Sequence, residues 1–63
     1  MKTYIVYKDS EERARFEHQT TDFEPFKFIL KNQSQSTQWA MRWEGWKVKE
    51  IDEDTGKEHF WKP

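Results

Sequence analysis

The chain contains no cysteine, which excludes disulfide bridges and thiolate metal sites and is compatible with a reducing compartment. It holds only two glycines and two prolines, and it has neither a glycine-rich phosphate loop nor a G-x-S-x-G nucleophile elbow. No run approaches the roughly 18 apolar residues that a membrane span needs. The apolar run at residues 4–7 is also too short for the core of a signal peptide. We therefore expect a cytoplasmic protein that does not act in a membrane.

Aliphatic side chains are scarce, so the core has to be built mainly from rings. There are three Ile, two Val and one Leu, against five Phe, four Trp and two Tyr. Each aromatic side chain can bury roughly 150–250 Å², whereas a chain this short buries only about 60% of the surface that its unfolded form exposes. We expect one small domain over residues 1–63, with at least one ring left at the surface.

Charges are abundant but almost balanced. Charged residues make up 37% of the chain, and the formal net charge is −1. This balance argues against bulk electrostatic attraction to DNA or to an anionic membrane, although a local patch could still bind.

The first segment predicts a β-hairpin. Residues Lys2–Lys8 are rich in β-branched and aromatic side chains, and their apolar centre indicates a strand covered on both faces. Residues 13–19 alternate, with Ala14 and Phe16 on one face, which favours a second strand after a polar turn at residues 9–12. A short helix over the second segment is the alternative, but it would bury only those two side chains.

The middle of the chain predicts helical structure. Thr21 and Glu24 match the capping box that starts a helix. Four apolar side chains then lie at helical spacing and form the expected inward face, whereas Phe28 points away from it. They are Phe23, Phe26, Ile29 and Leu30.

A polar run over residues 31–38 leaves the number of helices open. A single helix over residues 23–44 would carry two apolar faces on nearly opposite sides. A break near residues 32–34 would instead let Ser34 or Ser36 cap a second helix and turn both faces inward. We favour the broken arrangement.

The last third of the chain predicts two further strands. Gly45 suits the position after a helix that needs a positive φ. Residues 46–51 and 57–61 have strand patterns on either side of a turn at residues 52–56. The order ββα(α)ββ indicates an α+β fold, with an antiparallel sheet of about four strands packed against one long or two short helices.

The strongest candidate site is a cluster of tryptophans interleaved with cations. Trp39 and Trp43 are one helical turn apart, and Trp46 begins the next strand. Trp and Arg dominate protein–protein hot spots, and aromatic planes beside cations also stack the bases of single-stranded nucleic acids. The alternative is that these rings form the core. The candidate binding residues are Trp39, Arg42, Trp43, Trp46, Lys47 and Lys49.

Two acidic clusters at the expected hairpin turns form a second candidate. They are Asp9, Glu11 and Glu12 in the first turn, and Asp52, Glu53 and Asp54 in the last. If the helix is broken, the direction of the chain places both clusters at the same end of the sheet, whereas a single helix would place them at opposite ends. A shared acidic end would act as a rim that steers a basic partner, whereas the alternative is two solvated hairpin turns.

No metal or catalytic site stands out. Asp52, Asp54 and Gly56 have the spacing that begins a calcium loop, but the glycine is one position early and the glutamate expected at the twelfth position is missing. His18 and His59 have no neighbours at ligand-like spacing. We expect no metal, no cofactor and no enzymatic activity.

These features favour a small non-enzymatic protein-binding module that acts through an aromatic surface. Short, charge-rich, cysteine-free chains are what we expect of accessory or inhibitor proteins, including phage-encoded ones. One alternative is single-stranded nucleic-acid binding through the same tryptophans and cations. Another is a homodimer with the aromatic surface as its seam.

Overall fold

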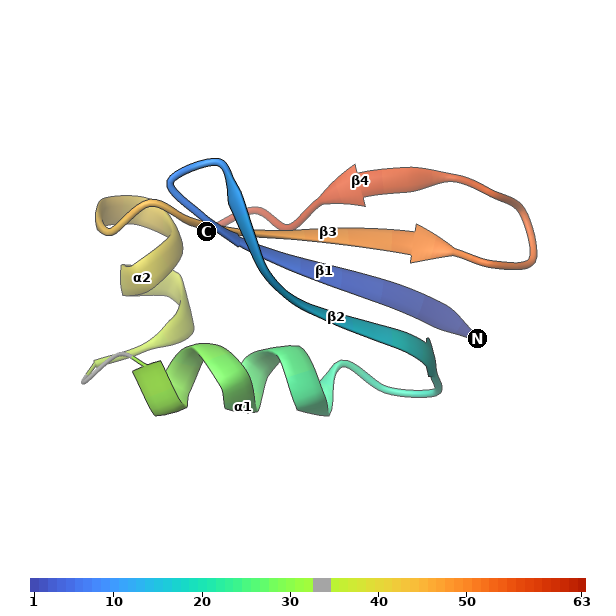
Figure 1. Ribbon diagram of the computed structural model, residues 1–63, viewed down its shortest axis with the longest axis horizontal. Helices are drawn as coiled ribbons and strands as arrows, with labels where there is room; N and C mark the ends of the chain where they lie inside the picture. Colours follow the sequence, from blue (N-terminus) through green and yellow to red (C-terminus); the bar gives the residue numbers. More distant parts are fainter. Residues whose placement is uncertain (33–34) are drawn as a thin grey trace.

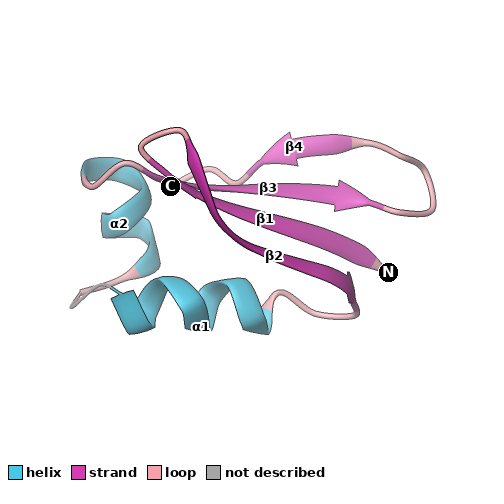
Figure 2. Cartoon of the chain, viewed as in Figure 1, coloured by secondary structure: helices cyan, strands magenta, loops and turns pink. Residues whose placement is uncertain are grey.

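The computed structural model describes residues 1–32 and 35–63, which form a four-stranded antiparallel sheet with two helices on one face (Figure 1). The strand order is β2-β1-β3-β4, and every neighbouring pair is antiparallel. The predicted α+β fold is confirmed. The elements in chain order, coloured by type in Figure 2, are β1 (Lys2–Lys8), β2 (Glu11–Gln19), α1 (Phe23–Asn32), α2 (Thr37–Trp43), β3 (Trp46–Asp52) and β4 (Glu58–Phe60).

The N-terminal hairpin has a tighter turn than expected. Asp9 and Ser10 both have positive φ, 52° and 68°, as in the two-residue turns that match the twist of paired strands. Glu11 and Glu12 belong to β2 and pair with the end of β1. The second segment is therefore a strand, as predicted, and not the alternative short helix.

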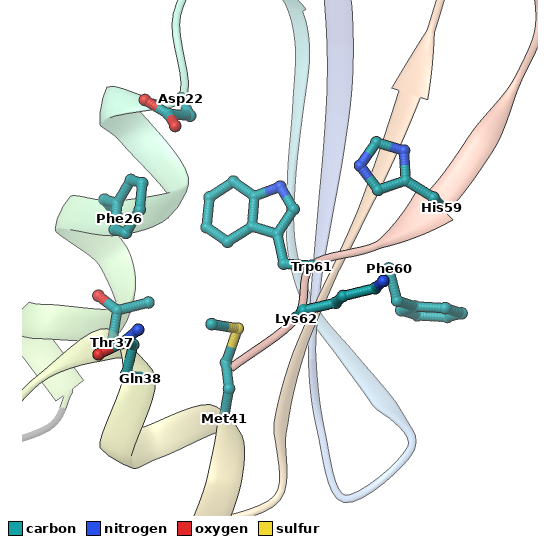
Figure 3. A pocket seen from close by; sticks show the side chains of 9 residues that line it. All are labelled: Asp22, Phe26, Thr37, Gln38, Met41, His59, Phe60, Trp61 and Lys62. Atoms are coloured by element: carbon teal, nitrogen blue, oxygen red, sulfur yellow. The ribbon is translucent and has the colours of Figure 1, made fainter.

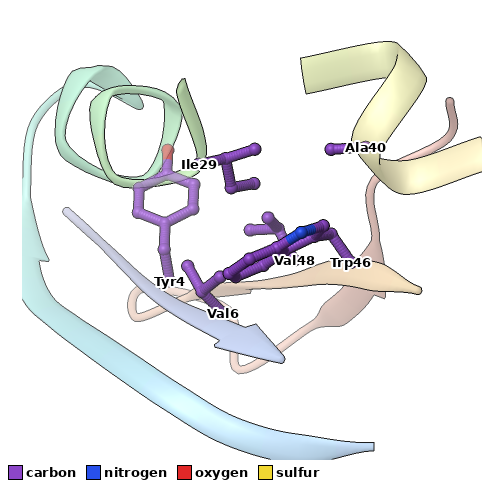
Figure 4. Close-up of a cluster of buried hydrophobic side chains, with 6 residues drawn as sticks. All are labelled: Tyr4, Val6, Ile29, Ala40, Trp46 and Val48. Atoms are coloured by element: carbon purple, nitrogen blue, oxygen red, sulfur yellow. The ribbon is translucent and has the colours of Figure 1, made fainter. Parts of the chain in front are cut away.

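The core lies between the sheet and the helices. β1 occupies the middle of the sheet, so residues 3–6 are buried. Val6 and Val48 are directly opposite each other on the helix-facing side of β1 and β3. The rings of Phe16 and Phe28 pack at the edge of this core, with centroids 6.0 Å apart. The buried cluster in Figure 4 consists of Tyr4, Val6, Ile29, Ala40, Trp46 and Val48.

The helical region is broken into two helices, as we favoured. The Ser36 hydroxyl accepts a hydrogen bond from the Trp39 backbone N at 3.1 Å, so the predicted serine cap of α2 is confirmed. The alternative cap, Ser34, lies outside the described residues. Gly45 follows α2 with φ +78°, as expected. Within the described ranges, neither helix is long and apolar enough to cross a membrane.

The predicted inward face of α1 is wrong except at Ile29, which is fully buried. Phe23, Phe26 and Leu30 are 61%, 37% and 48% exposed. Phe28, which was expected to point away, packs against the core. Apolar side chains surround most of this helix, so their spacing alone does not show which side faces the sheet.

The start of α1 also differs from the prediction. The Thr21 hydroxyl accepts a hydrogen bond from the backbone N of Phe23 at 3.4 Å. Within the described residues, the Thr21 backbone N–H donates no hydrogen bond to the Glu24 carboxylate, so the reciprocal capping box is not formed. The helix begins at Phe23, one residue too late for Thr21 to be its cap.

The two acidic turns lie at opposite ends of the sheet, so the predicted shared acidic end is wrong (Figure 1). β1 and β3 are antiparallel neighbours, with Lys8 opposite Trp46 and Lys2 opposite Asp52. The first turn therefore adjoins the start of β3, and the last turn adjoins the N-terminus. The reason is that α1 alone carries the chain back along the sheet, whereas the seven-residue α2 stays at one end.

Candidate functional site

The residues of the predicted tryptophan-rich site do not form one surface. Successive side chains of a strand point to opposite faces, so Trp46 enters the core while Lys47 and Lys49 point away from the helices. Trp46 is only 5% exposed, which removes it from any contact surface. Trp39, Arg42 and Trp43 lie on the outer side of α2, whereas Lys47 and Lys49 lie on the sheet face opposite the helices.

The α2 aromatic surface consists of Trp39, Arg42 and Trp43. The two rings are 43% and 65% exposed, and their centroids lie 6.1 Å apart at an interplanar angle of 55°. Thr37 and Ala40 attach the opposite side of the helix to the domain. Arg42 has no hydrogen-bond or ion-pair partner among the residues that the structure describes. Two exposed rings and a guanidinium that no described residue pairs with therefore lie on one short, anchored helix.

A hollow of about 680 Å³ lies between α1, α2 and the segment after β4 (Figure 3). Phe26, Met41 and Trp61 project toward it from three different parts of the chain. The rings of Phe26 and Trp61 are in contact, with centroids 4.7 Å apart. The full lining is Asp22, Phe26, Thr37, Gln38, Met41, His59, Phe60, Trp61 and Lys62.

Trp61 forms a fixed wall of this hollow. Its backbone N donates a hydrogen bond to the Val48 carbonyl at 2.9 Å, and its Nε1 donates to the Glu50 carboxylate at 3.0 Å. Lys2 Nζ donates to the same carboxylate at 2.7 Å. Burial raises the pKa of Glu50, but the hydrogen bonds from Lys2 and Trp61 outweigh it and hold that pKa below its ordinary value. Glu50 is therefore ionised near neutral pH and holds the indole in place.

A second apolar feature, the α1 stripe, consists of Phe23, Phe26 and Leu30. It borders a hollow of about 690 Å³ that also includes Asp22, Lys27 and Lys31. Phe26 lines both hollows, so apolar surface continues from α1 to the C-terminal segment. This surface was not predicted from the sequence, because the helical spacing of these three side chains had indicated that they face the core.

The sheet face away from the helices carries a smaller aromatic group. The rings of Tyr7 and Phe60 have centroids 6.2 Å apart. Lys47 is directly opposite Tyr7 in register, and Lys49 is directly opposite Phe60. Lys49 Nζ lies 5.8 Å from the Phe60 ring centroid and 3.3 Å from the Glu58 carboxylate. One of the two lysines is thus paired with an acid.

The acidic residues mostly have partners within the domain. Glu53 accepts hydrogen bonds from the His18 backbone at 3.1 Å and from the Thr3 hydroxyl at 3.2 Å. The Asp52 carboxylate accepts one from the Asp54 backbone at 2.9 Å, which shapes the turn. Across residues 1–32 and 35–63, no three His, Asp or Glu side chains gather where they could hold a metal ion. In the first hairpin, Asp9, Glu11 and Glu12 pair with Lys8, Arg13 and Arg15 at 3.4, 3.4 and 3.1 Å.

Comparisons with known protein families, with curated proteins and with solved structures found no match to this chain. The function therefore has to be argued from the chain's own surfaces. Of the predicted binding residues, the three that form the α2 aromatic surface lie together and are exposed.

Proposed function

We propose that this chain is a small non-enzymatic protein-binding module whose partner packs on the α2 aromatic surface. The observation that supports it best is the exposed pair Trp39 and Trp43 on one side of a helix that is capped and anchored to the sheet. A cysteine-free accessory or inhibitor protein of the cytoplasm, of cellular or phage origin, fits a chain of this size.

Most of the binding free energy would come from burying the rings of Trp39 and Trp43 against the partner. Burying a large apolar side chain contributes about 1.5–3 kcal/mol relative to leaving it in water, and tryptophan anchors are enriched among hot spots. The cost of ordering them is small, because α2 is already held by the Ser36 cap and by buried Ala40. Binding to a preformed surface avoids much of the entropy loss of association.

Arg42 gives this surface its expected polar specificity. Arg42 lines the same shallow hollow as Trp39 and Trp43, and its guanidinium has no acidic partner among the described residues. A carboxylate on the partner would satisfy it through two parallel hydrogen bonds. We therefore expect the partner to present an apolar pocket for the indoles with an Asp or Glu at its rim.

Affinity capture from a lysate with matched variants tests the proposal. The wild type is compared with Trp39→Ser/Trp43→Ser and with the control Lys47→Ser/Phe60→Ser, which alters exposed residues on the other face of the sheet. A partner should be retained by the wild type and the control and lost by the α2 variant. The purified partner should then bind Arg42→Ala at least about 10-fold more weakly, as for a hot-spot arginine.

Two outcomes would contradict the proposal. One is a partner that the α2 variant retains as well as the wild type does. The other is the absence of any protein that the wild type retains above a column without the chain. Circular dichroism of each variant shows beforehand that the fold is intact.

The rival function is single-stranded nucleic-acid binding. The observation in its favour is that the rings of Tyr7 and Phe60 lie beside Lys47 and Lys49 on the uncovered sheet face. Stacking on such rings contributes about 1–3 kcal/mol per base. A single nucleic-acid site that combines the tryptophans with these lysines is not formed, because Lys47 and Lys49 do not share a surface with the exposed Trp39 and Trp43.

A further inference from the structure

The α1 stripe is an uncovered apolar face on the outside of the molecule. In Figure 1, α1 lies along one border of the domain, and no other element lies beyond it. Phe23, Phe26 and Leu30 recur at intervals of three and four residues, so they share one side of the helix. Pro25 and Ile29 hold the other side against the sheet. The stripe is thus presented by a helix whose orientation is fixed.

The charges beside the stripe are ordered along the helix. Glu24 lies in the first turn and Lys31 in the last turn. The two side chains lie seven residues apart, which returns them to nearly the same flank of the helix. Neither has an ion-pair partner among the residues that the structure describes. Opposite charges therefore stand at the two ends of one flank.

We propose that the α1 stripe binds a second copy of this chain, with the two α1 helices antiparallel about a two-fold axis. A two-fold contact uses the same patch on both chains, so the patch has to complement itself. An antiparallel copy places Phe23 against the partner copy's Leu30 and Glu24 beside the partner copy's Lys31, and each contact occurs twice. A parallel copy would instead place the two charged flanks on opposite sides of the pair, so that Glu24 would not meet the partner copy's Lys31.

The middle of the helix is compatible with this pairing. Lys27 is the one cation near the centre of the exposed side, and its Nζ lies 5.6 Å from the Phe23 ring centroid of its own chain. The ammonium is thus drawn toward the first turn and not over the centre. Phe26 lines both hollows and Lys27 only the second, and as neighbours in the helix their side chains leave it in directions about 100° apart.

The size of the stripe indicates a reversible dimer. The exposed fractions of its three side chains leave on the order of 250 Å² of apolar surface on each chain. Even when the polar rims of both copies are included, the surface area that the dimer buries lies at the low end for specific interfaces, where association is transient. This inference does not depend on the proposed function, because it uses a different helix. A dimer would present two copies of the α2 aromatic surface.

Charge reversal at the two ends of the flank tests the proposal. Sedimentation velocity from roughly 5 to 500 μM should show the wild type self-associating as concentration rises. Glu24→Lys and Lys31→Glu should each weaken association at least about 10-fold, because each homodimer then has like charges at both ends. An equimolar mixture of the two variants, one isotope-labelled for native mass spectrometry, should restore a dimer that contains one chain of each kind.

Two further variants locate the contact. Phe23→Ser/Leu30→Ser should abolish self-association, whereas Lys47→Glu, an equal charge change on the opposite sheet face, should leave it unchanged. A wild type that stays monomeric over the whole range would overturn the proposal. So would charge variants that associate like the wild type, a mixture that forms no mixed dimer, or association that is lost in Trp39→Ser/Trp43→Ser but kept in Phe23→Ser/Leu30→Ser.

Discussion

The carboxylate of Glu50 accepts a hydrogen bond from Trp61 Nε1 at 3.0 Å and thereby joins the middle of β3 to the segment after β4. The Glu50 side chain is only 14% exposed, and its second partner is Lys2 on β1. Three segments that are distant in sequence therefore meet at one carboxylate. The indole that it holds packs on Phe26 of α1 and forms the wall of the hollow in Figure 3.

We expect Glu50→Gln to lower the free energy of unfolding by about 1–2 kcal/mol at neutral pH, since it weakens charged hydrogen bonds. The folded-state pKa of Glu50 is held below its ordinary value. Its contribution is therefore fully present above the pKa of the unfolded chain and is lost as the pH falls through the folded pKa. The difference between wild type and variant should shrink between about pH 5 and pH 3.

Urea unfolding followed by tryptophan fluorescence at several pH values measures this difference. Glu17→Gln is the control, because the Glu17 side chain is exposed and makes no polar contact within the described residues. It should change the stability at neutral pH by no more than about 0.5 kcal/mol. A difference in the free energy of unfolding between wild type and Glu50→Gln that stays constant down to pH 3 would contradict a stabilising role of the ionised Glu50 carboxylate.

Three of the four tryptophans, Trp39, Trp43 and Trp46, should differ sharply in their effect on stability. Trp46→Ala should cost about 3–5 kcal/mol, because it opens a cavity in the core. Trp46→Phe should cost far less, since the Nε1 of Trp46 has no hydrogen-bond partner among the described residues. Trp39→Ala and Trp43→Ala should each stay within about 1 kcal/mol of the wild type, as exposed side chains do. Thermal unfolding measures the stability of all four variants. A Trp43→Ala variant as unstable as Trp46→Ala would show that the outer face of α2 is packed.

The two glycines should not tolerate alanine equally. Both have positive φ, 78° at Gly45 and 76° at Gly56. An alanine held in this left-handed conformation lowers the free energy of unfolding by about 1–2 kcal/mol at either position. An added Cβ at Gly45 would also meet the Asp9 carboxylate, whereas nothing lies within 4 Å at Gly56. Gly45→Ala should therefore be the more destabilising in chemical denaturation, by the small cost of turning the exposed Asp9 side chain away.

Removing the Asp9 side chain should cancel that extra cost. In an Asp9→Gly background, which also suits the φ of 52° at this position, Gly45→Ala should cost no more than Gly56→Ala does. If the excess persists in that background, its origin is not the contact with Asp9.

A labelled single-stranded oligonucleotide should not bind measurably at low salt. Lys49 is paired with Glu58 at 3.3 Å, and the formal net charge of the chain is −1, so little counterion release is available to drive binding. Fluorescence anisotropy at low and high salt measures this. Binding that weakens steeply with salt and is lost in Lys47→Glu/Lys49→Glu would favour the nucleic-acid function over the protein-binding one.

The elements that local chemistry controls were predictable. β1 has a continuous apolar centre, the Ser36 hydroxyl can cap only the residues just after it, and Gly45 supplies the positive φ that ends α2. Each of these signals involves atoms within a few residues of one another, so no knowledge of the packing was needed. They led to the α+β class, the four strands and the broken helix.

The surfaces were decided by how the elements pack. The composition required that some rings remain outside, because 63 residues cannot enclose eleven aromatic side chains. Which rings these are depends on the rotation of α1 about its axis and on the side of α2 that meets β3. Those choices place Phe28 and Trp46 inside and leave Phe23, Trp39 and Trp43 outside.

The sequence by itself therefore determined the class of fold, the glycine stop after α2 and the excess of aromatic surface. These follow from local backbone chemistry and from the small volume that 63 residues can enclose. Only the tertiary structure divided the tryptophan cluster between the core and the α2 aromatic surface, and only it placed the acidic turns at opposite ends. The physical reason is that register, helix rotation and chain direction are set by contacts between residues distant in sequence, such as Lys2 with Asp52 and Lys2 with Glu50.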